Sequence, residues 1–212
     1  MTGREKKNWK TWAKNAVAEL DARDDGGPSY IPILPRHGVY LFCVAGDGRR
    51  FARLFGQTWR KLSLWARRRL LKHWRAARRE RYGDAPLVAP WPLVELVEFK
   101  SDFFRGNSEE ACAQYNHRMC SFAFLAETMD RFPDDAVECV IAHELAHAVH
   151  CIADADYHLD PANTEYDAWG YSQSECDADE MAENWGFDIE ARDQAVADFY
   201  RAECPQEVAR GL

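Results

Sequence analysis

Apolar residues recur at helical spacing in two long stretches of the chain. The first set is Phe51, Phe55, Trp59, Leu62, Ala66, Leu70, Trp74 and Ala77. The second set is Val137, Ile141, Leu145, Ala148 and Ile152. Steps of three and four residues place each set on one face of an α-helix. The pattern therefore predicts a helical segment over residues 47–82 and a second helix over residues 134–152.

Local signals refine both helices. Gly56 interrupts the first one and is a position where it could break or kink into two helices. The second follows Pro133, Asp134 and Asp135, and a proline with carboxylates in the first turn is a typical start of a helix.

Shorter apolar runs predict strands. Residues 38–44 and 92–99 have the composition of buried strands, and residues 113–116 and 121–125 are shorter candidates just before the second helix. Strands mixed with helices favour the α+β class. The simplest division is an N-terminal extension, residues 1–36, followed by a single domain over residues 37–212.

A stretch without period lies between residues 153 and 174 and is rich in Asp, Tyr and Ala. It predicts a loop in which Tyr157, Tyr166 and Tyr171 are candidate hydrogen-bond donors to a developing oxyanion, although surface tyrosines would give the same pattern.

Composition restricts the class of protein. With 212 residues, 47% of them hydrophobic, the chain can bury one sizeable core. No run approaches 18 apolar residues and residues 1–20 lack the apolar segment of a signal peptide, so we expect no membrane span and a cytoplasmic location. The seven cysteines are odd in number and form no Cys-x-x-Cys pair, which argues against a zinc ribbon and a secreted disulfide framework.

Charge is divided unevenly along the chain. Residues 1–100 hold 21 Lys and Arg against 10 Asp and Glu, whereas residues 101–212 hold 6 against 25. Most of the positive charge lies in residues 49–81, on the face opposite the apolar stripe. Three interpretations remain open for this face: binding to nucleic acid, binding to a membrane surface, or a cationic face that is solvated or paired internally.

Candidate chemistry centres on the pentapeptide His143-Glu144-Leu145-Ala146-His147. Residues four apart lie one above the other on a helix, so both imidazoles can bind a single metal ion. No other charged residue lies between Cys139 and Cys151, and polar groups among aliphatic residues are costly without a strong partner. Glu144 is placed to accept a proton from water at the metal's open position. The pattern therefore indicates a zinc site.

A zinc site needs a third protein ligand. Glu175 and Asp179 are four apart in residues 175–182, which look helical, so Glu175 could bind the metal while Asp179 accepts the free N–H of a ligand imidazole. His158 is an alternative third ligand. His150 and Cys176 lie near the proposed ligands and are weaker candidates.

The segment 140–149 resembles the extended signature of zincin metallopeptidases. The Glu175-x-x-Ala178-Asp179 pattern resembles the gluzincin branch, which includes thermolysin-like and ImmA-type peptidases. The resemblance covers roughly residues 110–187 and implies a catalytic core over about residues 110–190. It implies a zincin-like core with a small mixed sheet, a Zn2+ cofactor and a protein or peptide substrate.

Carried over to this chain, the resemblance makes His143, His147 and Glu175 the ligands, Glu144 the general base and Asp179 the residue that orients a ligand. Two alternatives stay open. One is a SprT-like protease acting on DNA-associated proteins, in which a histidine such as His158 is the third ligand. The other is a non-catalytic binding protein that zinc stabilises.

Overall fold

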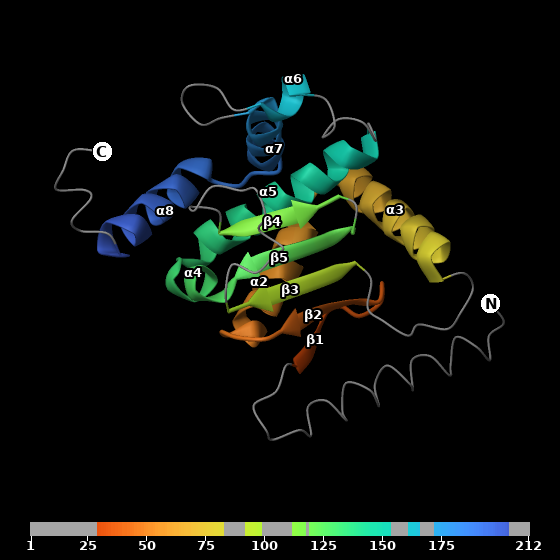
Figure 1. Cartoon of the computed structure of the whole chain (residues 1–212), viewed down its shortest axis with the longest axis horizontal. Helices are drawn as coiled ribbons and strands as arrows, with labels where there is room; N and C mark the ends of the chain where they lie inside the picture. Colours follow the sequence, from red (N-terminus) through yellow and green to blue (C-terminus); the bar gives the residue numbers. More distant parts are fainter. Residues whose placement is uncertain are drawn as a thin grey trace.

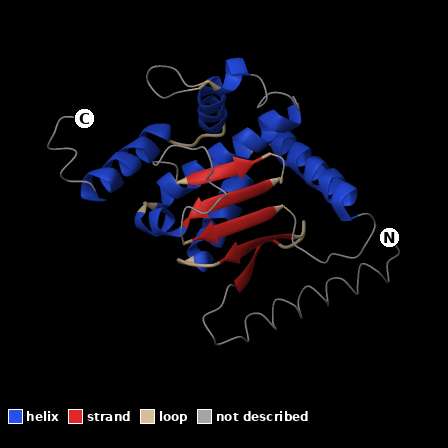
Figure 2. Ribbon diagram, viewed as in Figure 1, coloured by secondary structure: helices blue, strands red, loops and turns tan. Residues whose placement is uncertain are grey.

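The computed structural model describes residues 29–82, 92–98, 112–117, 119–153, 161–165 and 172–203. Its centre is a mixed five-stranded sheet in the order β1-β2-β3-β5-β4 (Figures 1 and 2). The strands are β1 Ser29–Leu34, β2 Val39–Cys43, β3 Leu93–Val97, β4 Ala113–Asn116 and β5 Ser121–Leu125. Strands β2, β3 and β5 run parallel, and an antiparallel strand flanks them at each edge. The predicted α+β class and the four predicted strands are confirmed.

Strand β1 was not expected, because its residues fall within the predicted N-terminal extension of residues 1–36. It pairs with β2 from Ser29 opposite Cys43 to Leu34 opposite Val39, with an irregularity between Pro32 and Leu34. Proline cannot donate to a strand ladder and is tolerated at an edge, which is where β1 lies. The prolines make this segment look unlike a strand in the sequence, but they are compatible with its position at the edge of the sheet.

Helices pack on one face of the sheet and around its β4 edge (Figure 1). They are α2 Gly48–Lys61, α3 Leu64–Tyr82, α4 Ala126–Arg131, α5 Asp134–Ala153, α6 Pro161–Thr164, α7 Gln173–Asn184 and α8 Ile189–Glu203. The first predicted apolar stripe is buried, apart from the half-buried Ala77. Its aromatic rings join the helices to the sheet: Phe51 lies 4.8 Å from Phe124, and Trp74 lies 6.2 Å from Phe122, centroid to centroid.

The predicted helical segment does break, but the suggested position at Gly56 is wrong. Helix α2 continues through Gly56 and ends at Lys61, after which Leu62 is extended with φ −54° and ψ 144°. The Ser63 hydroxyl then accepts the amide of Ala66 at 3.1 Å, which begins α3. A glycine inside a helix costs only about 1 kcal/mol, whereas a serine cap satisfies an otherwise unpaired amide.

Helix α5 is the central element of the core. It contacts α2, α3, α7, α8 and β4, and every residue from 136 to 149 is buried. By length and composition alone it could cross a membrane, but 78% of its apolar window is buried inside the protein. That extent of burial is typical of the core helix of a folded domain.

Cations of α2 bind the N-terminal half of α5. Arg50 and Arg53 each lie 2.7 Å from a carboxylate oxygen of Asp134, and Lys61 Nζ lies 2.5 Å from Glu138 Oε2. Arg50 also donates to the main-chain oxygens of Met129 and Phe132, where α4 turns into α5. Internal pairing, one of the three interpretations of the basic segment, therefore holds for these cations of α2.

Candidate metal centre

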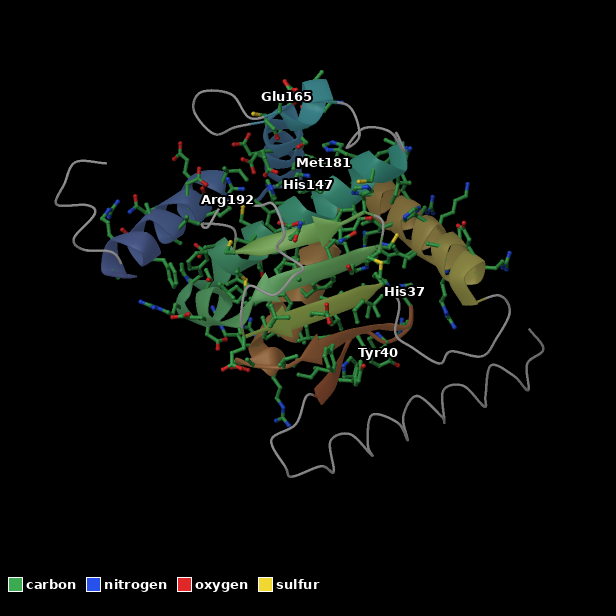
Figure 3. The ribbon with its side chains drawn as sticks, viewed as in Figure 1. His37, Tyr40, His147, Glu165, Met181 and Arg192 are labelled. Carbon is green, nitrogen blue, oxygen red and sulfur yellow. The ribbon has the colours of Figure 1, made fainter. Side chains whose placement is uncertain are left out.

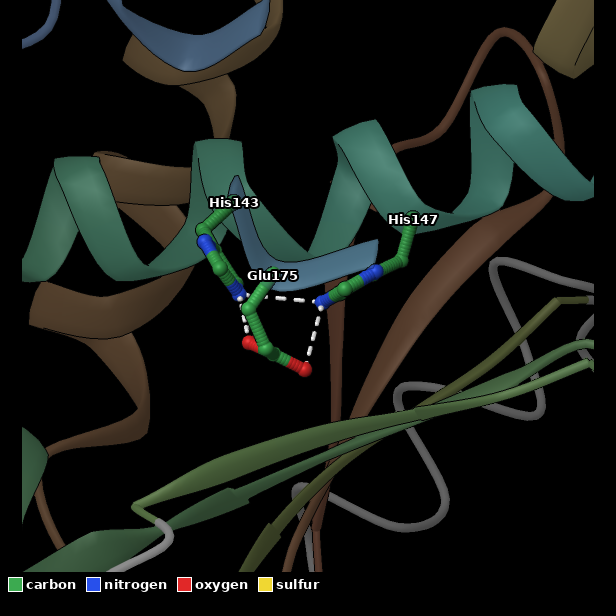
Figure 4. A group of neighbouring side chains, drawn as sticks. All are labelled: His143, His147 and Glu175. Atoms are coloured by element: carbon green, nitrogen blue, oxygen red, sulfur yellow. Dashed lines mark hydrogen bonds and ion pairs between the residues drawn. The ribbon is translucent and has the colours of Figure 1, made fainter. Parts of the chain in front are cut away.

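Helices α5 and α7 bring three metal-binding side chains together (Figure 4). His143 Nε2 lies 3.0 Å from His147 Nε2 and 3.0 Å from Glu175 Oε2, and His147 Nε2 lies 3.5 Å from Glu175 Oε1. Both histidines are buried and Glu175 is partly buried. The two imidazoles come from successive turns of α5, as the spacing predicted, and α7 provides the carboxylate.

The separations of these atoms suit one small cation. Ligands at 2.0–2.2 Å from a tetrahedral ion lie about 3.3–3.6 Å from one another, close to the observed 3.0–3.5 Å between the ligand atoms. Among the described residues, this is the one His, Cys, Asp and Glu group whose ligand atoms all lie within 4.8 Å of each other. The group could therefore hold a metal ion.

The charges around the metal-binding group also favour a bound cation. The carboxylates of Glu144, Glu175 and Asp179 lie around the two histidines, and the one guanidinium among them, that of Arg192, pairs with Asp179 and also with Asp193. An excess of at least two negative charges therefore remains when all these groups are ionised. A buried excess of this size is costly without a compensating cation. Two imidazole nitrogens with carboxylate oxygen form a donor set typical of zinc.

Asp179 occupies the position expected for a residue that orients a ligand. Its Oδ1 lies 2.6 Å from His143 Nδ1, the ring nitrogen that points away from Glu175. An acceptor at Nδ1 holds the proton there and leaves the Nε2 lone pair for a metal. The predicted juxtaposition of Asp179 with a ligand histidine is present in the structure.

Arg192 is a residue of this cluster that the sequence analysis missed. It extends from the first turns of α8 towards the α5–α7 junction (Figure 3) and binds both oxygens of Asp179, with Nη2 3.0 Å from Oδ2. Its Nη1 also lies 3.2 Å from His143 Nδ1, and its side chain is only 13% exposed. The bidentate contact fixes the plane of the carboxylate that in turn orients His143.

A glycine turn makes this contact possible. Helix α7 ends where the amides of Gly186 and Phe187 donate back to the carbonyls of Glu183 and Ala182, with Gly186 at φ +86°. This αL ending favours glycine and redirects the chain, so that α8 packs against α5 with Arg192 next to Asp179 of α7. The only local sequence signal for Arg192 was its rarity, as one of six basic residues in the acidic half.

The surroundings shift the pKa values of the cluster. Burial lowers the pKa of His143, but its hydrogen bonds to Asp179 and Glu175 outweigh burial and raise the pKa to about 9. Burial alone would raise the pKa of Asp179, but hydrogen bonds from His143 and Arg192 hold this pKa at about 2. The pKa of Glu175 is lowered because hydrogen bonds from His143 and His147 outweigh its burial. These shifts have one origin, because the carboxylates favour positive charge at the histidines.

Glu144 lies beside the cluster without being part of it. The side chain is buried, and its Oε2 has no hydrogen-bond partner in the part of the chain that the structure describes. Its carboxylate accepts the main-chain N–H of Tyr115, in the edge strand β4. Burial raises the pKa of Glu144, which is the shift expected of a group that takes up a proton.

The remaining candidates fall into two groups. His150 is half-buried on α5 and Cys176 is exposed on α7, and neither belongs to the metal-binding group. His158, Tyr157, Tyr166 and Tyr171 lie outside the described residues. Glu175 is a proposed third ligand that the structure places beside the histidines, whereas the rival His158 is not among the described residues.

No family model, no curated protein and no solved structure matches the chain.

Proposed function

We propose that the protein is a zinc-dependent peptidase in which Glu144 is the general base. The observation that carries the proposal is the juxtaposition of a three-ligand group, His143, His147 and Glu175, with a buried carboxylate that is not one of the ligands. Catalytic zinc sites typically have three protein ligands and an open position. A zincin-like core of the gluzincin type is part of the same proposal.

His143, His147 and Glu175 would hold the ion, and Asp179 with Arg192 would keep His143 in the tautomer that binds it. When bound, Zn2+ supplies a Lewis acid that polarises a carbonyl and acidifies water. Glu144 Oε2 has no protein donor within the described residues, so it is available to accept a proton. The same oxygen can return that proton to the leaving amine.

Strand β4 connects the proposed base to the proposed substrate. It is an edge strand of the sheet, and its Tyr115 amide already binds the Glu144 carboxylate. An extended polypeptide can pair with the free edge of a sheet. A peptide at this edge would lie next to Glu144, which supports a protein or peptide substrate.

A purely structural zinc site is the competing explanation. Structural sites are typically closed by four protein ligands, and three are present among the described residues. A closed site would also leave the buried Glu144 carboxylate without a role, although burying it costs free energy. Both observations support the catalytic proposal.

The experiment replaces Glu144 with Gln and measures two properties of the full-length protein. Zinc content, from elemental analysis, should stay near one ion per chain, while cleavage of an unfolded protein substrate should fall at least about a hundredfold. Glu138→Gln is the matched control, because it makes the same change on the same helix at a residue that pairs with Lys61. Equal cleavage by Glu144→Gln and the wild type would refute the proposed mechanism.

A further inference from the structure

One face of α3 is a row of exposed cations that begins at an exposed indole. Trp65, Arg68, Lys72, Arg75 and Arg79, here named the α3 stripe, are exposed and are spaced alternately by three and four residues. This spacing aligns them along the helix over about 21 Å. The opposite face, with Ala66, Leu70 and Trp74, is buried in the core. The stripe is therefore the solvent side of a helix that is fixed in place.

The α3 stripe differs from the cations of α2. Arg50, Arg53 and Lys61 all bind carboxylates of α5. Arg68, Lys72 and Arg75, by contrast, form no ion pair or hydrogen bond with any residue that the structure describes. Glu80, in the last turn, is the only carboxylate of α3. Three neighbouring cations are therefore held close together without a protein counter-charge in the described fold, and a chain of phosphates would supply one.

Trp65 indicates which kind of phosphate polymer would bind to the α3 stripe. Its side chain is 54% exposed at the start of the stripe, and the Arg69 guanidinium lies 5.0 Å from the ring centroid. Single-stranded nucleic acids bind where a cationic track follows the backbone and aromatic rings stack with bases. A paired duplex keeps its bases inside and offers no free base face to an indole. The combination therefore favours a single strand.

A membrane surface fits the same helix less well. A membrane-bound amphipathic helix buries its apolar face in lipid, whereas the apolar face of α3 is already buried in the protein. Leu64 and Trp65 are the exposed large apolar residues of α3, and both lie in its first turn. In Figure 1, α3 lies on the opposite side of the molecule from α8 and away from the acidic helix α7. A polyanion on the stripe would thus avoid most of the repulsion from the acidic half.

We propose that the α3 stripe binds single-stranded nucleic acid, with phosphates on Arg68, Lys72 and Arg75 and a base stacked on Trp65. The interaction is independent of the metal centre, so it stands whether or not the protein is a peptidase.

The test is fluorescence anisotropy of a labelled 20-nucleotide oligothymidylate with the full-length protein at several salt concentrations. Three phosphate contacts should give a slope of about −2 in log affinity against log salt. The triple variant Arg68→Gln, Lys72→Gln, Arg75→Gln should abolish most of this slope. Trp65→Ala should weaken binding about tenfold while the slope stays unchanged, since stacking adds no charge contact. Circular dichroism verifies that each variant is folded.

The matched control removes three exposed arginines elsewhere, with Arg49→Gln, Arg60→Gln and Arg201→Gln, so that the net charge changes equally. Retained affinity in this control and loss in the stripe variant is the expected result. Equal loss in both would show attraction by overall charge and would overturn the proposal. So would undetectable binding at 50 mM salt, tighter binding to the matching duplex, or binding only to phosphatidylserine vesicles.

Discussion

Two clusters of charge lie along the same buried helix, and they differ in how complete they are. Near the start of α5, Lys61 and Glu138 form a one-to-one pair, and Asp134 meets Arg50 and Arg53. Two turns further on, His143, His147 and Glu175 converge on one another, and Glu144 retains a buried oxygen with no donor among the described residues. The first cluster is satisfied by the protein alone, whereas the second has acceptors in excess.

This difference distinguishes charged groups that stabilise the fold from charged groups that can bind a ligand. A complete ion pair joins two elements of the fold. Its two charges already neutralise each other, so it does not attract a charged ligand. An incomplete cluster costs free energy until a cation or proton joins it, and such costs are typical of functional sites. The two clusters should therefore respond oppositely to mutation: one through stability, the other through metal affinity.

The largest expected effect is on the ligands. His147→Ala or Glu175→Ala should weaken zinc binding at least about a hundredfold, because loss of a ligand should exceed the 10–100-fold cost of losing an outer contact. Competition with a chromophoric chelator measures the affinity. His158→Ala is the control for the rival third ligand and should bind zinc as the wild type does. If His158→Ala weakened zinc binding more than Glu175→Ala did, His158 and not Glu175 would be the third ligand.

A smaller effect is expected at Arg192. Arg192→Met should reduce zinc affinity about tenfold, since Asp179 loses the bidentate contact that positions it against His143. Arg192→Lys should recover only part of this loss, because an ammonium lacks the planar fork of a guanidinium. Arg201→Met, on the exposed side of the same helix, is the control. Unchanged zinc affinity in Arg192→Met would limit Arg192 to holding α8 in place.

The complete pair should show the opposite behaviour. Lys61→Met should lower the free energy of unfolding by about 1 kcal/mol, because the mostly buried Glu138 loses its partner while the lysine itself is half exposed. Urea unfolding of the metal-free protein measures the loss. Zinc affinity should stay at the wild-type value. Adding Glu138→Leu to Lys61→Met should restore stability, and a zinc defect in the single variant would show that the two clusters are coupled.

Asp134 should give the smallest effect. Hydrogen bonds from Arg53 and Arg50 lower the pKa of Asp134, so its ionised form stabilises the fold. That contribution is present above the usual pKa of an aspartate, about 3.9, and is lost as the pH falls through the lowered value. Asp134→Asn should therefore cost a few tenths of a kcal/mol at pH 7, since the pair is exposed. The difference from the wild type should shrink as urea unfolding is repeated towards pH 2, and a constant difference would contradict the assignment.

The sequence predicted the parts of the site that depend on local spacing. His143 and His147 share a face because they are four apart on one helix, and the same holds for Glu175 and Asp179. The position of Arg192 depends instead on the αL turn at Gly186 and on how α8 packs against α5. Strand β1 depends on pairing with β2, which overrides its prolines. Features of this kind arise from contacts between different elements, so they produce no periodic pattern in the sequence.

The burial of α5 restricts how this protein can change over evolution. Every residue from 136 to 149 is enclosed, so the stretch of α5 that carries the histidines has no surface on which substitutions are free. Neighbouring alanines such as Ala142 and Ala146 are fully buried and leave little room for a larger side chain. Variation in specificity would have to arise on other elements that border the site, such as β4 and α8. In a family of relatives, we would expect α5 to be the most constant segment and the surrounding elements to vary.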